Sequence, residues 1–186
     1  MPGARIQDGD RVTLRTVERE DVPFLQRAHA DPAIRYPLGS PVKTQSQIEE
    51  WLADYDGEQF LVCLDGDRDV PGQPRSDGTT TNERPIGVVS VEDADWRRPE
   101  LTYWLVPEVH GEGYGREAVS LVVEYVFRVH DTPGVGAVAY DFNDASRGLL
   151  ESLGFTEEGR IRMDRFVDGE YRDTIQYGLL REEWQN

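Results

Sequence analysis

Three glycines at alternate positions are the residues in this chain best suited to bind a ligand. Gly111, Gly113 and Gly115 stand between an extended apolar run that ends at Val106-Pro107 and a segment with helical spacing. Glycines leave backbone N–H groups uncovered, and the first turn of a helix adds unpaired N–H groups and the positive end of its dipole. A strand, a glycine turn and a helix start together predict an anion site, most often for phosphate or pyrophosphate.

One interpretation of the glycines is a dinucleotide site, which would make the protein an oxidoreductase. Gly113-x-Gly115-x-x-Ala118 formally matches the Rossmann fingerprint, and Asp141 follows the next predicted strand, where a ribose-binding acid belongs. In that fold the first glycine follows its strand almost directly, whereas residues 107–112 intervene here. Only one short helix and a hairpin are predicted after Asp141, too little for the further βα units that the fold needs. A P-loop is excluded because no Gly-Lys-Ser/Thr sequence follows.

The charge of the chain argues against one class of partner. The formal net charge is −16, from 36 acidic and 20 basic residues, and Lys43 is the single lysine. Because nucleic-acid binding depends on a basic face, we expect no nucleic-acid partner. The acidic residues are spread along the chain and arginine is favoured over lysine, so we hypothesise a halophilic protein that stays soluble in concentrated salt.

Composition also sets expectations for compartment, metals and thiol chemistry. No apolar stretch approaches the length of a membrane span and no secretory apolar segment follows Met1, so we expect a cytoplasmic protein without a membrane partner. Cys63 is the only cysteine and stands in an apolar run, which predicts a buried, unreactive thiol. His29, His110 and His130 lack metal-ligand spacing, and no metal is expected.

The predicted fold class is α/β, with a mixed sheet of about six to seven strands, helices on both faces, and one domain over residues 1–186. Apolar patterning predicts strands at 11–14, 60–64, 85–91, 100–106, 135–140, 160–167 and 170–180. It predicts helices at 16–30, at 44–55, from the glycine turn to about 129, and from Asn143 or Asp144 to 153.

Turn residues divide these elements. Asp31-Pro32 ends the first helix, and Gly154 closes the last one in the left-handed conformation. Asp168-Gly169 predicts a tight hairpin turn. The segment 65–84, rich in Gly, Pro and Asp, is expected to be a mobile hairpin loop.

Taken together, the chain resembles the GNAT superfamily of N-acyltransferases, in particular the RimJ/RimL type that acetylates the N-termini of ribosomal proteins. His110-Gly111-Glu112-Gly113-Tyr114-Gly115 matches the coenzyme motif Arg/Gln-x-x-Gly-x-Gly/Ala after its first position. The resemblance covers nearly the whole chain, and its other parts are Val12–Arg15 with Glu20-Asp21, Asp31-Pro32, Ile34–Tyr36, Trp51-Leu52, Glu100–Leu105, Asn143-x-x-Ser146, Leu153–Phe155 and Glu183-Trp184.

This resemblance implies acetyl-CoA as cosubstrate, bound where the strand ending at Val106 parts from the strand at 135–140. The pyrophosphate would rest on the amides of residues 111–116. The coenzyme-binding residues implied in this way are Leu105, Val106, His110, Gly111, Glu112, Gly113, Tyr114, Gly115, Arg116, Asn143 and Arg147.

The implied reaction is direct attack of a neutral amine on the thioester, which needs a base, oxyanion donors and stabilisation of the thiolate. By resemblance Glu100 is the general base; the alternative is a solvated carboxylate at a strand start. Backbone amides near Leu105 and Val106 would stabilise the oxyanion. Ser146 would donate to the thiolate, or else is a first-turn helix serine, and Asn143 either orients the coenzyme, caps the helix, or does both.

Three positions depart from the superfamily pattern. Leu150 stands where many members carry a tyrosine that protonates the thiolate, so that role falls to Ser146, to water or to no group. His110 replaces the usual Arg or Gln, and Glu112 puts a negative charge beside the pyrophosphate site, which Arg116 or Arg147 could offset.

The acceptor stays open at this stage. It is an amine-bearing molecule: a protein N-terminus, an aminoglycoside-like polyamine, or a small amino acid or amine. One scaffold serves many acceptors. A second hypothesis is a non-catalytic acyl-CoA sensor on the same fold. The sequence leaves monomer and homodimer equally open. Candidate pocket aromatics, which could equally be core residues, are Tyr36, Trp51, Trp104 and Tyr171.

Overall fold

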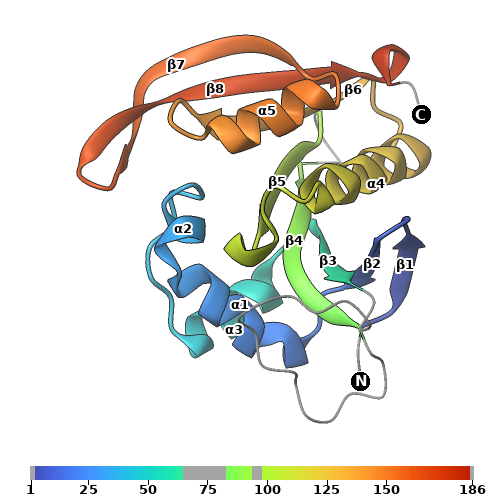
Figure 1. The fold of residues 1–186 in the computed structure, drawn as a ribbon, viewed down its shortest axis with the longest axis vertical. Helices are drawn as coiled ribbons and strands as arrows, with labels where there is room; N and C mark the ends of the chain where they lie inside the picture. The colour runs from blue at the N-terminus through green and yellow to red at the C-terminus, as the bar shows by residue number, and fades with distance from the viewer. Residues whose placement is uncertain (1–2, 65–82, 94–97, 185–186) are drawn as a thin grey trace.

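The computed structural model describes residues 3–64, 83–93 and 98–184 and contains one eight-stranded mixed sheet (Figure 1). Its spatial order is β1-β2-β3-β4-β5-β6-β8-β7. The strands are β1 Arg5–Asp8, β2 Val12–Thr16, β3 Glu58–Leu64, β4 Arg84–Glu92, β5 Glu100–Leu105, β6 Gly134–Tyr140, β7 Thr156–Val167 and β8 Glu170–Leu180. The helices are α1 Val22–Ala30, α2 Pro32–Arg35, α3 Gln45–Asp54, α4 Tyr114–Val129 and α5 Asp144–Ser152, with 3₁₀ turns at Arg19–Asp21, Pro107–Val109 and Arg181–Glu183.

The predicted fold class is confirmed, with one strand more than the six to seven expected. The additional strand is β1, a short and largely exposed edge strand paired with β2. Its residues lack the apolar alternation that predicts a half-buried strand. The predicted mobile loop 65–84 lies outside the described residues except for its last two, and the antiparallel pairing of β3 with β4 shows that it connects a hairpin.

Local sequence explains where the helices begin and end. The predicted first helix divides into a 3₁₀ turn and α1, because Asp21 bonds back to the Glu18 amide (2.8 Å) in a capping box. At α3 the Thr44 hydroxyl accepts from the Gln47 amide and the Gln47 side chain accepts from the Thr44 amide, a second capping box. Asp168 and Gly169 both have positive φ, as the predicted tight hairpin between β7 and β8 requires.

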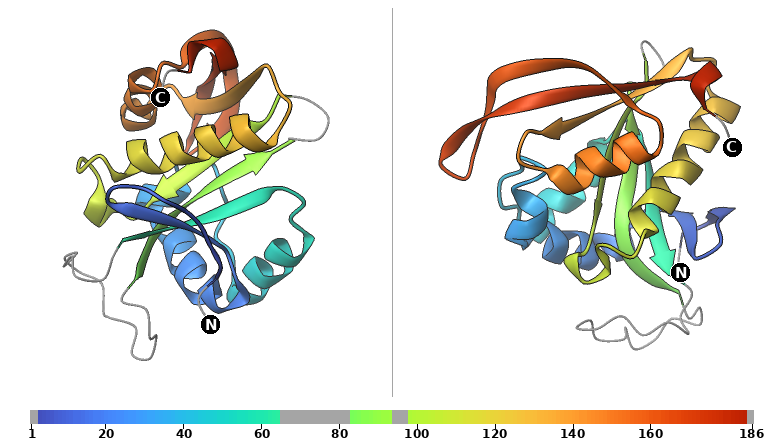
Figure 2. Two further views of the ribbon diagram at one scale, coloured as in Figure 1. Left: turned by 90° about the vertical axis from the view of Figure 1, so that its right-hand side faces the viewer. Right: turned by 45° about the horizontal axis from the view of Figure 1, so that its top comes forward.

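Helices cover both faces of the sheet, as Figures 1 and 2 show from three sides. On one face α1 packs against β5, where Phe24 and Trp104 lie 5.6 Å apart between ring centroids. On the other face α4 contacts β2, β4, β5 and β6, and α5 contacts α4 and β6. The buried stripe of α4 (Ala118, Val119, Val122, Val123 and Val126) fills the core on that side.

The feature that creates a site is the parting of β5 and β6. These two strands are parallel, and they pair only at Glu100 with Gly136 and at Leu101 with Ala137. Beyond these positions β5 remains paired with β4, and β6 remains paired with β8. One parallel pair in an otherwise antiparallel sheet is incompatible with a doubly wound dinucleotide fold, which needs a mostly parallel sheet.

Candidate active site

A cavity of about 680 Å³ opens where β5 and β6 part. Its walls come from β5, β6, the glycine turn, the start of α5 and the α2 region. The residues that line it are Ala33, Ile34, Pro37, Leu38, Leu101, Thr102, Tyr103, Trp104, Leu105, Val109, His110, Gly111, Gly113, Gly115, Arg116, Val138, Ala139, Tyr140, Asn143, Ala145, Ser146 and Leu149. The volume suits a ligand of the size of a cofactor or drug.

The glycine turn has the backbone that its sequence predicts. Gly111 and Gly113 have φ of +80° and +81°, in the left-handed region that side chains disfavour. Gly113 is the N-cap of α4, so the amides of Tyr114, Gly115 and Arg116 occupy the first helical turn without intrahelical acceptors. A Cβ at Gly111 would contact nothing within 4 Å, and the turn is exposed along one wall of the cavity. The arrangement fits an anion such as a pyrophosphate.

An arginine from the other end of the chain supports this turn. Arg11 donates to the Glu112 carbonyl (2.8 Å) and forms an ion pair with Glu117 on α4 (2.9 Å). Its guanidinium also lies 4.8 Å from the ring centroid of Tyr114. Arg11 therefore brings positive charge to the turn that carries Glu112. Sequence reasoning missed it, since nothing in the local pattern links residue 11 to a turn a hundred residues away.

The end of β5 presents one of the two expected oxyanion amides to the cavity. The Val106 amide donates to the Ile86 carbonyl of β4 (2.8 Å), so it points away from the cavity and is not available to a ligand. Amides alternate in direction along a strand, so that of Leu105 points toward the side from which β6 has parted. His110 bonds through Nε2 to the Leu105 carbonyl (2.9 Å), which places the imidazole against the strand end.

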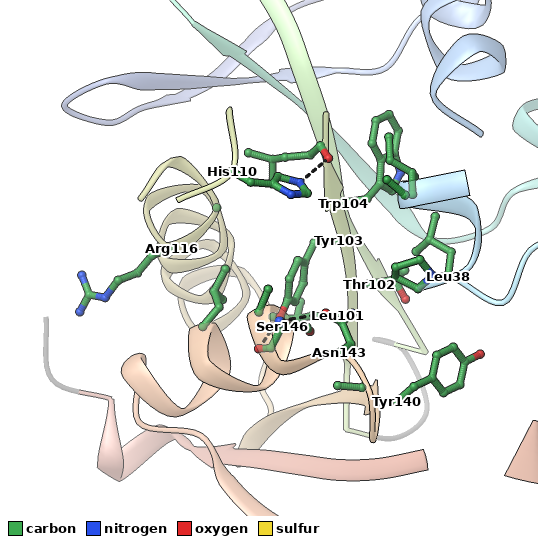
Figure 3. A pocket seen from close by; sticks show the side chains of 18 of the residues that line it. Leu38, Leu101, Thr102, Tyr103, Trp104, His110, Arg116, Tyr140, Asn143 and Ser146 are labelled. Atoms are coloured by element: carbon green, nitrogen blue, oxygen red, sulfur yellow. Dashed lines mark hydrogen bonds between the residues drawn. The ribbon is translucent and has the colours of Figure 1, made fainter. Parts of the chain in front are cut away.

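Ser146 and Asn143 meet at the start of α5, inside the cavity. The Asn143 side chain accepts from the Ser146 amide (3.2 Å), which confirms that it caps the helix. The Ser146 hydroxyl lies 2.8 Å from the Tyr103 hydroxyl of β5 (Figure 3). Burial raises the pKa of Tyr103 to about 12, although the bond with Ser146 opposes this shift, so the phenol stays protonated at neutral pH.

Tyr103 brings a second hydroxyl to the start of α5 that sequence reasoning did not identify. Leu150, at the position of the superfamily tyrosine, is fully buried in the core. Tyr103 reaches Ser146 from the opposite wall instead. The alternation of side chains along β5 could have identified Tyr103, because residues 101, 103 and 105 share the face that turns toward α4 and α5.

Glu100 lies at the start of β5, where β5 and β6 are still paired, and it does not line the cavity. Strand alternation puts it on the same face as Thr102 and Trp104, which do line it. The pKa of Arg98 is raised, first by its hydrogen bond to Glu158 and also by the negative charge of Glu100, so Glu100 lies near this guanidinium.

Four of the predicted coenzyme-binding residues do not line the cavity: Val106, Glu112, Tyr114 and Arg147. Arg147 points to the far side of α5, where its guanidinium contacts Tyr177 (3.3 Å), the Asp141 carbonyl (3.4 Å) and Asp144 (3.4 Å). Arg116 does line the cavity and is exposed, which makes it the nearer of the two arginines considered as partners for a phosphate.

The two faces of β5 present different surfaces to the cavity, as Figure 3 shows. Tyr103, His110 and Ser146 lie on one side, and Trp104, Thr102 and Leu38 lie on the other. This second side is closed by the α2 region, through Ala33, Ile34, Pro37 and Leu38. Within the described part of the chain, no carboxylate lines the main cavity. Of the four candidate aromatics, Trp104 alone lines this cavity; Tyr171 lies exposed on the far hairpin against Phe166.

Other reactive groups lie elsewhere. Cys63 is buried, as predicted, and burial raises its pKa to about 12, so the thiol is not a nucleophile at neutral pH. Among the described residues no three His, Cys, Asp or Glu side chains form a metal-binding group. None of the described helices combines the length and apolar character needed to span a membrane.

A family profile described as the acetyltransferase (GNAT) domain matches residues 11–156. The putative ribosomal N-acetyltransferase YdaF of Bacillus subtilis is 33% identical over 101 residues, 53% of this chain and 55% of that protein. The spermidine N(1)-acetyltransferase of Escherichia coli K12 is 23% identical over 180 residues, 93% of this chain and 88% of that one.

Among solved structures, the spermidine N-acetyltransferase of Vibrio cholerae in complex with CoA and spermine superposes with a TM-score of 0.79 at 21% identity. The match covers 96% of this chain and all of that one. At this level of identity the similarity establishes a shared fold.

Proposed function

Because this chain belongs to the GNAT acetyltransferases, enzymes that use acetyl-CoA as cosubstrate, we propose that it acetylates a primary amine in the cavity between β5 and β6. The observation that carries the proposal is the parting of β5 and β6 directly beside the start of α4. A cleft that ends at unpaired helix amides accommodates an extended ligand with a pyrophosphate at one end.

On the coenzyme side, the amides of residues 113–116 would bind the pyrophosphate, with Arg116 and Arg11 supplying positive charge. The Leu105 amide would stabilise the oxygen of the thioester during attack. Ser146 would donate to the departing thiolate, and Tyr103 would orient the Ser146 hydroxyl and share its proton. Support comes from the 2.8 Å contact between the two hydroxyls and from the position of both in the cavity wall.

Glu100 would be the general base, acting through water. It stands on the Trp104 face of β5, the face toward which an amine entering past α2 would lie. Because Glu100 does not line the cavity, direct contact with the amine would require a shift of side chains, whereas one or two waters could carry the proton.

The acceptor we favour is the N-terminal amine of a protein or peptide. Polyamines and aminoglycosides carry several positive charges, and their recognition depends on carboxylates. The lining of the main cavity from the described residues is mostly apolar on the acceptor side and contains no carboxylate. The similarity to YdaF supports this choice, whereas the similarity to spermidine N(1)-acetyltransferases supports a polyamine as the second candidate.

Thiol release from acetyl-CoA in the presence of different amines tests the proposal. We expect turnover with peptides that have a free N-terminus, none with the same peptides after N-acetylation, and lower activity with spermidine. Tight binding of acetyl-CoA without turnover on any amine would instead support the acyl-CoA sensor. Preference for spermidine by tenfold or more would reverse our choice of acceptor.

We also propose a cytoplasmic, salt-adapted protein. The net charge of −16 with a single lysine supports salt adaptation, because counterions screen the repulsion among dispersed carboxylates. A single, buried cysteine is consistent with a compartment where disulfides are rare.

A further inference from the structure

A second, smaller cavity of about 60 Å³ lies behind Trp104, on the acceptor side of β5. It shares Leu38, Thr102 and Trp104 with the main cavity, so the two adjoin. His29 from α1 and Gln59 from β3 also line it. Of the residues unique to this cavity, Trp51 alone belongs to the stretches that carry the acetyltransferase resemblance. We call it the acceptor subsite.

Two buried nitrogen atoms in the acceptor subsite have no hydrogen-bond partner among the described residues: Nδ1 of His29 and Nε2 of Gln59. The His29 side chain is 6% exposed and lies between two indoles, with ring centroids 5.6 Å from Trp104 and 6.1 Å from Trp51. Leaving a buried polar group unpaired is costly, so two such atoms in one cavity call for a ligand that pairs with both.

The chemistry of these atoms selects the ligand. The amide nitrogen of Gln59 can only donate. Burial, and then the charge of Lys43, lower the pKa of His29 to about 4, so the imidazole is neutral at physiological pH and can donate through Nδ1 in one tautomer. The Lys43 ammonium lies 4.8 Å above the Trp51 ring and adds positive potential. Two donors near a cation suit an oxygen atom and disfavour an ammonium group.

Size limits the ligand further. One water molecule needs roughly 10–15 Å³ of such volume, so 60 Å³ accommodates a small group and not the chain of a polyamine. Glu92 is the one carboxylate among the described residues that line the acceptor subsite; it is exposed and accepts from the Tyr55 hydroxyl (3.1 Å). It therefore stands at the outer end of the subsite rather than beside the two unpaired nitrogens.

We propose that the acceptor subsite binds the carbonyl-type oxygen next to the amine of the acceptor, with Gln59 and His29 as its donors. The inference rests on the proposed acetyltransferase function and deepens it. The acceptor is then an α-amino acyl compound, in which the oxygen belongs to the first peptide bond of a peptide or to the carboxylate of a free amino acid. A polyamine lacks such an oxygen.

Matched acceptors test this directly. Alaninamide has the amide oxygen, alanine has the carboxylate, and isopropylamine has neither. We expect kcat/KM for alaninamide, calculated on the concentration of the neutral amine because the two amines differ in basicity, to exceed that for isopropylamine by at least about 100-fold, the scale on which a site with unpaired donors rejects an analogue. In His29→Phe and in Gln59→Met this ratio should fall about tenfold each, as the loss of one hydrogen bond predicts. Alanine compared with alaninamide distinguishes the two sources of the oxygen.

Control variants separate a specific effect from a general one. His130→Phe and Gln45→Met make the same side-chain changes at positions that line neither cavity, and the ratio should stay as in the wild type. The Kd for acetyl-CoA should be unchanged in all four variants. If spermidine is a better substrate than alaninamide and its use depends on Glu92 (Glu92→Gln) rather than on His29, the inference is overturned.

If no amine is turned over, the proposed function fails, but binding to the acceptor subsite can still be measured. The imidazole resonances of His29, followed by NMR with CoA bound, should shift when alaninamide is added and not when isopropylamine is added. No shift up to tens of millimolar alaninamide means that the acceptor subsite does not bind this class of ligand.

Discussion

In the proposed function the two sides of β5 serve one reaction, but they are built differently. The coenzyme side is made mainly of backbone: the turn at Gly111 and Gly113, the free amides at the start of α4, and the edge left when β6 departs. The acceptor side is made of side chains, among them Trp104, His29 and Leu38, from elements that are far apart in the sequence. A site made of backbone leaves a local signature in glycines, whereas a site made of side chains leaves none.

This difference has a consequence for function. Many acetyltransferases can share a backbone cradle, because acetyl-CoA is the same for all of them, while the opposite wall changes with the acceptor. Changes on the coenzyme side should therefore lower activity with every acceptor alike. Changes on the acceptor side should alter the choice of amine, so variants on each side test whether the two walls have different roles.

The largest effect is expected from Gly113→Val. A β-branched residue at φ +81° is strained and would cover the amides at the start of α4. We expect the Kd for acetyl-CoA, measured by calorimetry, to rise at least about 100-fold, equivalent to the loss of one or two charge-assisted bonds. Gly169→Val places the same strain (φ +83°) in the distant hairpin turn and should retain affinity. Affinity within about threefold of the wild type in folded Gly113→Val would refute the phosphate cradle.

Glu100→Gln comes next. Loss of a general base should lower kcat at neutral pH by roughly 100-fold and leave the Kd for acetyl-CoA nearly unchanged. Raising the pH should recover part of the activity, because more of the amine is then already deprotonated. Glu50→Gln, an exposed position on α3, controls for the change in charge. Activity near that of the wild type at neutral pH would make Glu100 a structural residue.

Ser146→Ala should have a smaller effect, about tenfold on kcat, or about 1.4 kcal/mol. The start of α5 already favours a thiolate through its free amides, which lowers the need for an acid. If Tyr103 acts through Ser146, as we propose, Tyr103→Phe combined with Ser146→Ala should lose little more than Ser146→Ala alone. Ser152→Ala, at the other end of α5, is the control. A loss beyond about a thousandfold in Ser146→Ala would make Ser146 an obligatory acid.

The smallest effect concerns the whole surface. If the charge of −16 reflects salt adaptation, the melting temperature should rise by several degrees from low to molar KCl. The stabilisation by salt should not favour one side of β5 over the other, because the acidic residues are dispersed. A melting temperature that does not respond to KCl would contradict a halophilic origin of the charge.

The fold and the coenzyme turn could be predicted because their signals are local. Period-2 and helical patterns gave most strands and helices to within a few residues, and Asn143 and Asp168-Gly169 marked a cap and a turn. β1 was missed because an exposed edge strand has little apolar pattern. Arg11 and Tyr103 were missed because their roles arise only from tertiary contacts, at the glycine turn and at Ser146.

Less of the acceptor side could be predicted from the sequence. Trp104 and Trp51 were recognised as candidates, but nothing local distinguished a pocket from a core position. His29 has the spacing of an ordinary buried helix residue, and only its environment reveals an unpaired nitrogen. The direction of the Val106 amide likewise depends on β4, which is remote in the sequence.

Amide hydrogen exchange with and without acetyl-CoA shows whether β5 separates a coenzyme side from an acceptor side. If it does, acetyl-CoA should strongly protect residues 111–116 and the start of α5, with little change in α1 and around the α2 region. Adding an amine acceptor should then protect residues 29–38. Protection by acetyl-CoA that spares residues 111–116, or that falls mainly on α1 and α2, would contradict the account.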